Sequence, residues 1–341
     1  MKSAPLGVAV AGLGTWGPNL TRCLATARGA RLAALCDVDP RRLAVAATRF
    51  PGVRTCPDLE TCLKDPSVQA VILAVPAALH ERTALKALRA GRHVLVEKPI
   101  ATTLAGARRM DAEARRRRLV LGVGHTFEYH PAVAAIRTLL RRRALGRMHY
   151  ILSRRLSMGS VRTDVDALWN LAPHDVSILT DVLGGGPRWV SARGGAWLSR
   201  GLADLVTMEM GFPGNVLAQV QVSWLFPLKV RETILVGEKR MMVFNDVAAG
   251  RTLQLYDRSA RDLYPRSFGE FRRASRSAEG RVLTVPAAEP LAVEVQDFVD
   301  ACRTGRPMRA NAGRGILVTA VLEAASRSMA ADGRRIPFLT P

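Results

Sequence analysis

The chain has 341 residues, 48% of them hydrophobic, and a formal net charge of +21 at pH 7. A chain of this length is expected to fold as two domains, with enough apolar residues for two cores. No apolar run approaches the length of about 18 residues that a membrane-spanning helix needs, which argues against an integral membrane protein.

The five cysteines are odd in number and form no CxxC pair, which argues against a disulfide framework and against a structural zinc site. The N-terminal segment has one lysine and a short apolar run that leads directly into a glycine motif. This pattern predicts a first strand rather than a signal peptide. We therefore expect a cytoplasmic protein that uses no metal.

The net charge raises the question of nucleic-acid binding, because arginine clusters occur at 115–118 and 141–143. Both clusters lie near the ends of predicted helices, where cations complement the helix dipole. The excess of arginine over lysine looks like a bias of the whole sequence, and no nucleic-acid-binding motif is present. We expect neither a nucleic-acid nor a membrane partner.

The first 124 residues alternate between two periodicities. Continuous apolar runs predict strands, and between them lie segments with helical periodicity, for example at 80–90 and 103–117. Strands that alternate with helices indicate a doubly wound α/β domain, whose parallel sheet is covered on both faces. The predicted strands are 6–11, 31–36, 70–75, 93–96 and 119–123.

From about residue 125 the pattern changes, and alternating strands joined by short turns predict hairpins of an antiparallel sheet. We therefore expect a first domain at 1–124 and, at 125–341, an α+β domain with an open, mostly antiparallel sheet. The Arg- and Ser-rich segment 258–284 predicts a loop. The predicted strands are 147–156, 188–198, 204–211, 215–226, 230–237, 240–245 and 252–257, and the predicted helices are 131–143, 165–183, 290–304 and 313–331.

The first predicted strand runs into the motif Gly12-Leu13-Gly14-Thr15-Trp16-Gly17. The first glycine of such a motif allows a tight turn, the second lets the backbone approach a pyrophosphate, and the third lets the helix pack on the strand. The helix N-terminus then offers N–H groups to the phosphates. Because the motif lies between a strand and a helix, it favours a dinucleotide site in a Rossmann domain over a purely structural turn.

The second predicted strand is followed by Asp37, 20 residues after Gly17. A carboxylate at this place can hold both ribose hydroxyls of the adenosine half and repels a 2′-phosphate. We therefore expect NAD rather than NADP as the cofactor, although Arg41 and Arg42 lie close by and weaken that preference.

Ligands of such sheets bind beyond the carboxyl ends of the strands. Val75 ends the predicted strand 70–75, and Pro76 and His80 follow it. All three are expected to face the cofactor, although His80 could equally be a helix-start residue without a role. Glu97 and Lys98 follow the strand at 93–96. Lys98 can stabilise an alkoxide as a hydride leaves, and Glu97 can orient the ribose or nicotinamide. An ordinary surface ion pair is the alternative.

The motif GLGTWG, the stretch VEKPI at 96–100 and NLAPHD at 170–175 resemble the Gfo/Idh/MocA family, the glucose–fructose oxidoreductase and inositol dehydrogenase type. The resemblance spans almost the whole chain. It implies hydride transfer between a nicotinamide cofactor and a ring hydroxyl or ketone of a sugar, nucleotide sugar, amino sugar or cyclitol. It also implies that Lys98 is the active-site lysine and that the bond before Pro99 is cis.

The segment 166–179 predicts a helix on which Asn170 and His174 share one face. His174 is expected to be the general base, since an unperturbed imidazole has a pKa of about 6.5. The family pattern has aspartate where Asn170 stands. Asparagine cannot shuttle a proton, but it can bond a sugar hydroxyl or orient His174. We expect Lys98 and His174 to converge on one substrate oxygen. Further candidates for substrate contacts are His125, Tyr129, Arg155 and Trp169, with Asp175 as a supporting residue.

Two alternatives stay open at this point. One is an NAD-dependent glycoside hydrolase that oxidises its sugar transiently, and the other is a cofactor-binding regulator without chemistry. The exposed face of the second sheet cannot easily stay bare in water, and members of the family commonly pair such faces. We therefore expect a homodimer or homotetramer.

Overall fold

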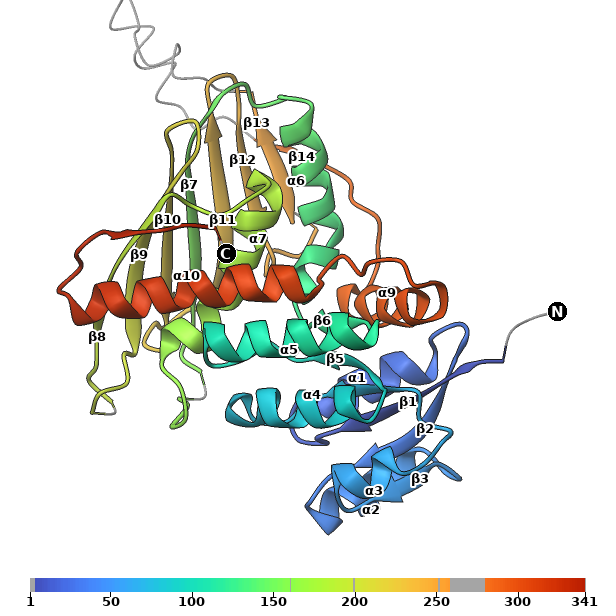
Figure 1. Cartoon of the computed structure of the whole chain (residues 1–341). Helices are drawn as coiled ribbons and strands as arrows, with labels where there is room; N and C mark the ends of the chain where they lie inside the picture. Colours follow the sequence, from blue (N-terminus) through green and yellow to red (C-terminus); the bar gives the residue numbers. More distant parts are fainter. Residues whose placement is uncertain (1–3, 160, 199, 251, 258–279, 341) are drawn as a thin grey trace, which may run out of the picture. The chain divides into compact units, whose positions relative to one another are not determined.

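A computed structural model describes residues 4–159, 161–198, 200–250, 252–257 and 280–340 (Figure 1). The chain divides into two compact units. The first comprises Met1–Tyr129 with Ala288–Ala320, and the second comprises His130–Ala287 with Val321–Pro341. Most of the predicted loop at 258–284 lies outside the described residues.

The sheet of the first unit has six parallel strands in the order β3-β2-β1-β4-β5-β6. This is the doubly wound Rossmann order, so the predicted fold class is confirmed. The strands are β1 (Leu6–Ala11), β2 (Ala30–Cys36), β3 (Arg54–Cys56), β4 (Ala70–Leu73), β5 (His93–Val96) and β6 (Leu121–Val123). The strand order reverses between β1 and β4, and ligands of such sheets bind at that point.

Helices of the first unit are α1 (Gly17–Ala25), α2 (Pro40–Arg49), α3 (Leu59–Leu63), α4 (His80–Arg89), α5 (Leu104–Arg117) and α9 (Pro290–Thr304). Three begin at side-chain caps: Asp39 accepts from the N–H of Arg41 at α2, Asp58 from that of Thr61 at α3, and Thr103 from that of Gly106 at α5. Because right-handed crossovers run in opposite directions from β1 and β4, helices cover both faces of the sheet.

The first unit also takes in residues far along the chain. The apolar face of α9, with Val295 and Phe298, is buried in the same core as β1 and α1. The segment before α10 extends the sheet edge, where the N–H of Val123 donates to the carbonyl of Ala310 at 2.9 Å. The sequence predicts a single boundary after residue 124, close to the first observed boundary, but not this return of 288–320.

The sheet of the second unit has nine strands in the order β14-β13-β12-β11-β7-β10-β9-β8-β15. Among the described strands of this second sheet, only β7 and β10 pair in parallel, which confirms a mostly antiparallel sheet. The strands are β7 (Met148–Leu156), β8 (Trp189–Gly195), β9 (Leu205–Phe212), β10 (Val216–Ser223), β11 (Val230–Gly237), β12 (Met241–Asn245), β13 (Leu253–Tyr256), β14 (Arg281–Val282) and β15 (Ile336–Pro337).

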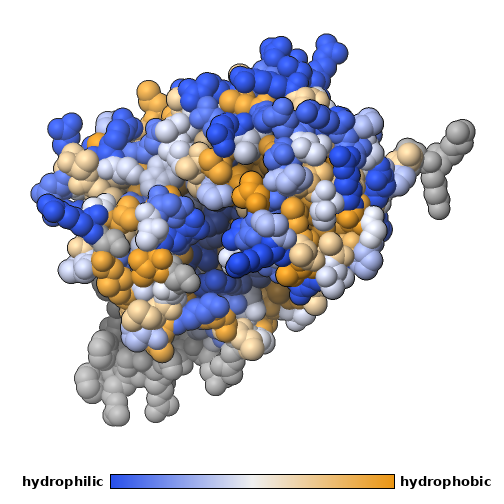
Figure 2. All heavy atoms as spheres, turned by 90° about the horizontal axis from the view of Figure 1, so that it is seen from below, coloured by the Kyte–Doolittle hydropathy of each residue, from blue (hydrophilic) through white to orange (hydrophobic). Residues whose placement is uncertain are grey.

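Helices α6 (Pro131–Arg141) and α7 (Ala167–Leu183) pack on each other, and α7 lies on one face of the sheet against β7, β9 and β10 (Figure 1). Helix α10 (Ala312–Ala330) begins in the first unit and ends in the second. Within the described part of the chain, no helix combines the length and apolar character needed to cross a membrane. In Figure 2, hydrophilic residues cover much of the visible face and hydrophobic residues form small patches among them.

Candidate functional site

The glycine motif lies at the point where the strand order of the first sheet reverses. Gly12 has a φ of +93°, and a Cβ there would lie 2.5 Å from the carbonyl oxygen of Ala74 at the end of β4. A Cβ on Gly17 would lie 1.9 Å from the carbonyl oxygen of Gly12. Both positions therefore require glycine, one for its conformation and both for the close approach of backbone. Thr15 and Trp16 are exposed between them.

Asp37 holds the glycine loop in place. Its Oδ2 accepts the backbone N–H of Leu13 at 2.6 Å, and its Oδ1 accepts that of Asp39 at 2.9 Å. The residue is only 5% exposed. The carboxylate predicted to face a ribose is therefore also bonded to the phosphate loop, and its remaining lone pairs can still accept bonds from hydroxyls.

Arg42 adds a cation beside this carboxylate. Its Nη1 lies 3.7 Å from Asp37 Oδ2, and its Nε lies 3.5 Å from Asp39 Oδ2. The same guanidinium is the nearest group to a Cβ built on Gly14, at 3.6 Å. A half-exposed cation thus lies between the glycine loop and the start of α2, whereas Arg41 donates only its backbone N–H to the Asp39 cap.

The exit of β4 is tied to the segment after β5 by His80. This residue is 1% exposed, and its Nδ1 lies 2.7 Å from the carbonyl oxygen of Pro99 while its Nε2 lies 2.9 Å from that of Val75. The ring is therefore turned toward the backbone on both sides. Val75 is half-buried and Pro76 is exposed at the start of the 3₁₀ turn Ala77–Leu79.

Glu97 and Lys98 follow β5, and the Lys98–Pro99 bond is cis, as the resemblance implies. The Lys98 N–H donates to Glu97 Oε2 at 3.1 Å. Burial raises the pKa of Glu97 to about 7, against the opposing effect of the Lys98 charge. The nearby Trp16 side chain also opposes this rise, so the glycine loop reaches the segment that carries Lys98.

A group of buried polar residues lies behind Glu97 in the first unit. A Cβ on Gly124 would lie 3.0 Å from Glu97 Oε2, so the carboxyl rests on the segment after β6. Two residues further, Thr126 donates to Oε2 of the fully buried Glu294 at 2.8 Å. Burial, and then repulsion from Glu97, holds the pKa of Glu294 well above its usual range. The site therefore favours the protonated form of Glu294.

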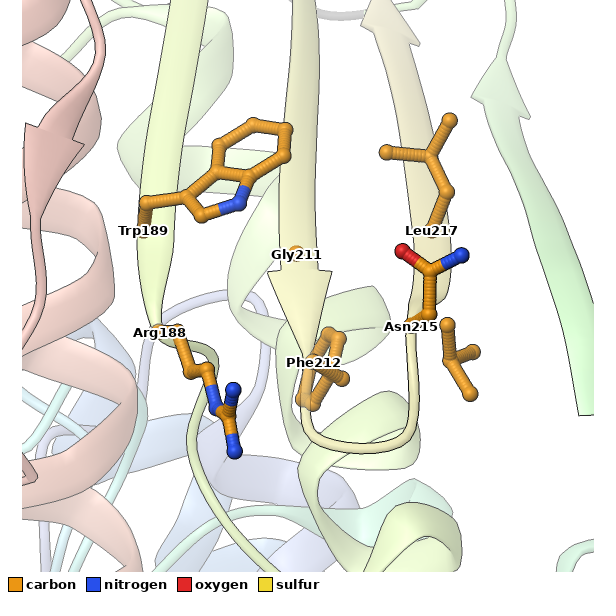
Figure 3. Close-up of a pocket in the computed structure, with 7 residues that line it drawn as sticks. Arg188, Trp189, Gly211, Phe212, Asn215 and Leu217 are labelled. Carbon is orange, nitrogen blue, oxygen red and sulfur yellow. The ribbon is translucent and has the colours of Figure 1, made fainter.

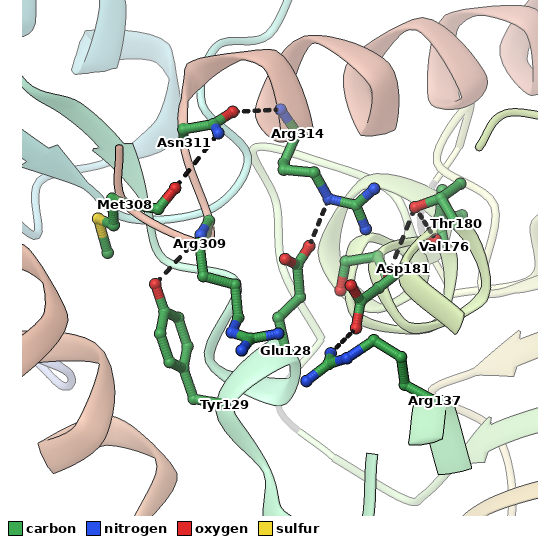
Figure 4. Close-up of polar contacts among 12 residues, drawn as sticks. Glu128, Tyr129, Arg137, Val176, Thr180, Asp181, Met308, Arg309, Asn311 and Arg314 are labelled. Atoms are coloured by element: carbon green, nitrogen blue, oxygen red, sulfur yellow. Dashed lines mark hydrogen bonds and ion pairs between the residues drawn. The ribbon is translucent and has the colours of Figure 1, made fainter. Parts of the chain in front are cut away.

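His125 and Tyr129 are both buried in the first unit. Burial, with repulsion from Arg314 and Lys98, lowers the pKa of His125 to about 3, so the ring is neutral. The Tyr129 hydroxyl donates to Asp297 Oδ2 at 2.7 Å and accepts the N–H of Ala310 at 3.1 Å. Figure 4 shows this tyrosine beside the pair formed by Arg314 Nε and Glu128 Oε1, which are 3.3 Å apart. These contacts tie Tyr129 to α9 and to the segment before α10.

In the second unit, Trp169, Asn170 and His174 lie on α7, which begins at the cap Asp166. All three are half-buried. The indole Nε1 of Trp169 donates to Ser326 Oγ on α10 at 3.1 Å, which fixes the ring. Asn170 and His174 are four residues apart and therefore lie on one face of the helix.

Arg155, a predicted substrate contact, is 6% exposed and bound to Asp175 of α7. Its Nε donates to Asp175 Oδ2 at 2.8 Å. The guanidinium is thus engaged within the second unit, directly beside the residue that follows His174.

Sequence reasoning missed three of these features: the placement of Arg42 over the glycine loop, the approach of Trp16 to Glu97 and the buried Glu294. Only the arginine carried a signal in the sequence, through its closeness to Asp37. Among the residues that the structure describes, no group of three or more His, Cys, Asp or Glu side chains could hold a metal ion.

The first unit fits a dinucleotide. Helix α1 starts without a side-chain cap. Pro18 has no N–H, and that of Asn19 donates to the Trp16 carbonyl at 3.0 Å, so the N–H of Gly17 is the group at the helix start that can bind phosphate. The nearest atom to a Cβ on Gly14 is 3.6 Å away, which leaves this turn open to a pyrophosphate. Gly12 and Gly17 are therefore packed against backbone while Gly14 leaves space for a ligand, as a Rossmann phosphate site requires.

Two protein-family models match the chain. The model described as "Oxidoreductase family, NAD-binding Rossmann fold" matches residues 6–125. The model described as "GFO/IDH/MocA C-terminal domain" matches residues 133–243.

Individual relatives are similar over different lengths. An inositol 2-dehydrogenase of Acidothermus cellulolyticus is 34% identical over 176 residues, which are 50% of this chain and 52% of that protein. A UDP-N-acetylglucosamine 3-dehydrogenase of Acidithiobacillus ferrooxidans is 27% identical over 294 residues, 85% of this chain and 88% of that protein. The crystal structure of GenD2 from gentamicin A biosynthesis, in complex with NAD, is 29% identical with a TM-score of 0.82 and covers 99% of this chain and 98% of its own. The match thus spans about half of the first relative and nearly all of the other two.

Proposed function

Because the chain belongs to the Gfo/Idh/MocA oxidoreductase family, as its motifs predict, we propose that it transfers a hydride between NAD and a ring hydroxyl or ketone. The substrate is a sugar, nucleotide sugar, amino sugar or cyclitol, in keeping with relatives named for inositol and UDP-N-acetylglucosamine. The observation that carries the proposal is the glycine loop, open at Gly14 and placed where the strand order reverses, in the same sheet as β5, which Lys98 follows.

The first unit would hold the cofactor, which supplies the hydride acceptor or donor. The N–H groups of Gly14 and Gly17 bind the pyrophosphate, and Asp37 accepts bonds from ribose hydroxyls. Val75 and Pro76 border the loop at the exit of β4. Glu97 orients the ribose or nicotinamide.

Proton transfer is assigned to α7 and to the segment after β5. Lys98 donates hydrogen bonds to the substrate oxygen and stabilises negative charge there. His174 takes the hydroxyl proton as general base. Asn170 has no titratable group, so it binds a neighbouring hydroxyl and leaves the base role to His174 alone. Trp169, fixed by Ser326, offers its ring face to the substrate.

The first test follows nicotinamide absorbance while the protein turns over myo-inositol, UDP-N-acetylglucosamine, a free amino sugar or glucose with NAD. We expect turnover with at least one of them. Lys98→Ala and His174→Ala should each lower kcat by about 10²-fold or more while NAD binding persists. Near-normal turnover in both variants would contradict the proposed roles.

Lys86→Ala and His149→Ala are the matched controls. Lys86 is half-exposed on α4 and pairs with Glu60, and His149 lies on β7, so neither substitution should change turnover. Two of the relatives described above are named as dehydrogenases, so we do not propose a glycoside hydrolase. A cytoplasmic location stays a prediction from the sequence.

We also propose that two copies pair through the outer face of the nine-stranded sheet. Ser153 and Arg155 of β7 point toward α7, because both bond Asp175 of that helix. Side chains alternate along a strand, so Tyr150 points to the opposite face. The residues that pair with Tyr150 from strand to strand form an apolar row across seven strands. The row consists of Trp189, Gly211, Leu217, Tyr150, Val236, Met241 and Tyr256.

One end of this row is shaped as a pocket of about 220 Å³ (Figure 3). The Trp189 indole lies flat across Gly211, where a Cβ would be 2.1 Å from its Nε1. The guanidinium of Arg335 stacks 3.9 Å from the ring centroid. A partly exposed tryptophan ring beside a pocket suits a self-complementary interface.

Leu217→Glu should shift light-scattering mass from an oligomer to a monomer at micromolar concentration, because the row would have to bury an unpaired charge. Thr48→Glu, on the exposed surface of α2 in the first unit, is the control and should leave the mass unchanged. A wild-type monomer would contradict the oligomer proposal.

A further inference from the structure

An ion pair in the interior of the second unit lies directly beside His174. Asp175 is 2% exposed and Arg155 is 6% exposed. Arg155 Nε donates to Asp175 Oδ2 at 2.8 Å, and its Nη2 donates to Oδ1 at 3.3 Å. Both carboxylate oxygens are therefore bound by one guanidinium, a geometry that fixes orientation as well as distance.

The same carboxylate is anchored to the centre of the sheet. Ser153 Oγ donates to Asp175 Oδ1 at 2.8 Å and lies 3.0 Å from Thr233 Oγ1. Ser153 and Arg155 lie on β7, which is hydrogen-bonded to both β10 and β11. Every member of this network is buried. Helix α7 is therefore attached through Asp175 to the centre of the sheet.

The backbone of α7 is weakest just before this attachment. Pro173 lies inside the helix and has no N–H to donate to the carbonyl of Trp169. A proline at such a position kinks a helix or loosens the turn that precedes it. The turn that carries Asn170 and the turn that carries His174 are therefore coupled less firmly than in an uninterrupted helix.

We propose that the Arg155–Asp175 pair is a positioning device for His174. The pair fixes the half of α7 after Pro173 on the sheet, so that the imidazole keeps one place although the helix ladder is interrupted beside it. Arg155 then acts through Asp175 and is not itself a substrate ligand. The proposal rests on the role of His174 in the proposed function.

The same helix offers a matched control pair. Asp181 forms an ion pair with Arg137 of α6 (Figure 4). This pair is almost as well buried as the Arg155–Asp175 pair. Asp181 follows His174 by nearly two turns and lies beyond the Arg155 network. A purely structural role of Asp175 predicts equal effects on catalysis when either carboxylate is neutralised.

The experiment compares Asp175→Asn with Asp181→Asn in the full-length protein, with NAD and myo-inositol or UDP-N-acetylglucosamine. Asparagine keeps the shape of each carboxyl group and part of its hydrogen bonding. We expect Asp175→Asn to lower kcat by about 10²-fold, the effect of a displacement of about 1 Å at a reacting group, with little change in KM. Asp181→Asn should leave kcat near the wild-type value, and Arg155→Lys should restore part of the loss seen with Arg155→Met.

A second measurement needs no substrate. In protein labelled at histidine, the ring signal of His174 is identified by its loss in His174→Ala. We expect this signal to broaden or split in Asp175→Asn and to stay sharp in Asp181→Asn. Equal losses of kcat in the two variants, or an unchanged ring signal in Asp175→Asn, would overturn the positioning role. Near-normal turnover of His174→Ala would instead overturn the proposed function, while the ring signal would still test the position of His174.

Discussion

The buried carboxyl of Glu97 makes the stability of the first unit depend on pH in a predictable direction. Burial raises its pKa from 4.5 to about 7. The folded chain therefore holds this proton more tightly than the unfolded chain, and stability falls as the pH rises from 4.5 to about 7. A shift of one pKa unit corresponds to about 1.4 kcal/mol, so the full effect is about 3 kcal/mol. Because the side chain as a whole is only partly buried, solvent screens part of this effect, and we expect a loss of stability of about 1–3 kcal/mol.

Glu97→Gln removes the titrating group and keeps a side chain of the same shape. The variant should differ little from the wild type at pH 5, where both side chains are neutral. At pH 8 it should be more stable by about 1–3 kcal/mol, since only the wild type carries a buried charge. The assay is urea unfolding of the cofactor-free protein at both pH values, followed by circular dichroism.

Glu113→Gln serves as the control, because Arg117 and Arg116 lower the pKa of Glu113 and its charged form is the favoured one. This variant should show no gain of stability that grows with pH. If Glu97→Gln changed stability equally at pH 5 and pH 8, burial would not be raising the pKa of Glu97, and the reasoning would be refuted.

Three further substitutions test the first unit. Gly12→Ala should cost about 1–3 kcal/mol from its positive φ alone and should abolish NAD binding in a fluorescence titration, because the new Cβ meets the Ala74 carbonyl. Arg42→Ala should weaken NADP binding more than NAD binding in the same titration, whereas Arg41→Ala should not; equal effects would place the 2′-phosphate elsewhere. Glu294→Gln should not lower the thermal unfolding midpoint at pH 7, because the site favours an uncharged side chain, and a large drop would show that the charged form is the one held.

The sequence predicts the parts of this site that local backbone chemistry dictates. Gly12 and Gly17 must be glycines because no Cβ fits, and a motif with that requirement is visible in one dimension. The order of strands and helices likewise follows from periodicity. What periodicity cannot show is which sheet a helix covers, so the return of α9 to the first unit was not predicted. Side-chain partners such as Glu294 and Arg42 are fixed by that packing, and their roles appear only in three dimensions.

The two units hold their candidate groups by different means. In the first, backbone geometry does so: a positive φ at Gly12 and a His80 ring bonded to carbonyls at two strand exits fix the loops that carry the site. In the second, a proline interrupts the helix beside His174, so side chains must supply the rigidity. Asn170 makes this rigidity more important. It cannot accept a proton, so His174 is the one proposed base on this face of α7 and must itself be well placed. A single base on an interrupted helix needs an external anchor, and Asp175 is the residue through which the sheet provides it.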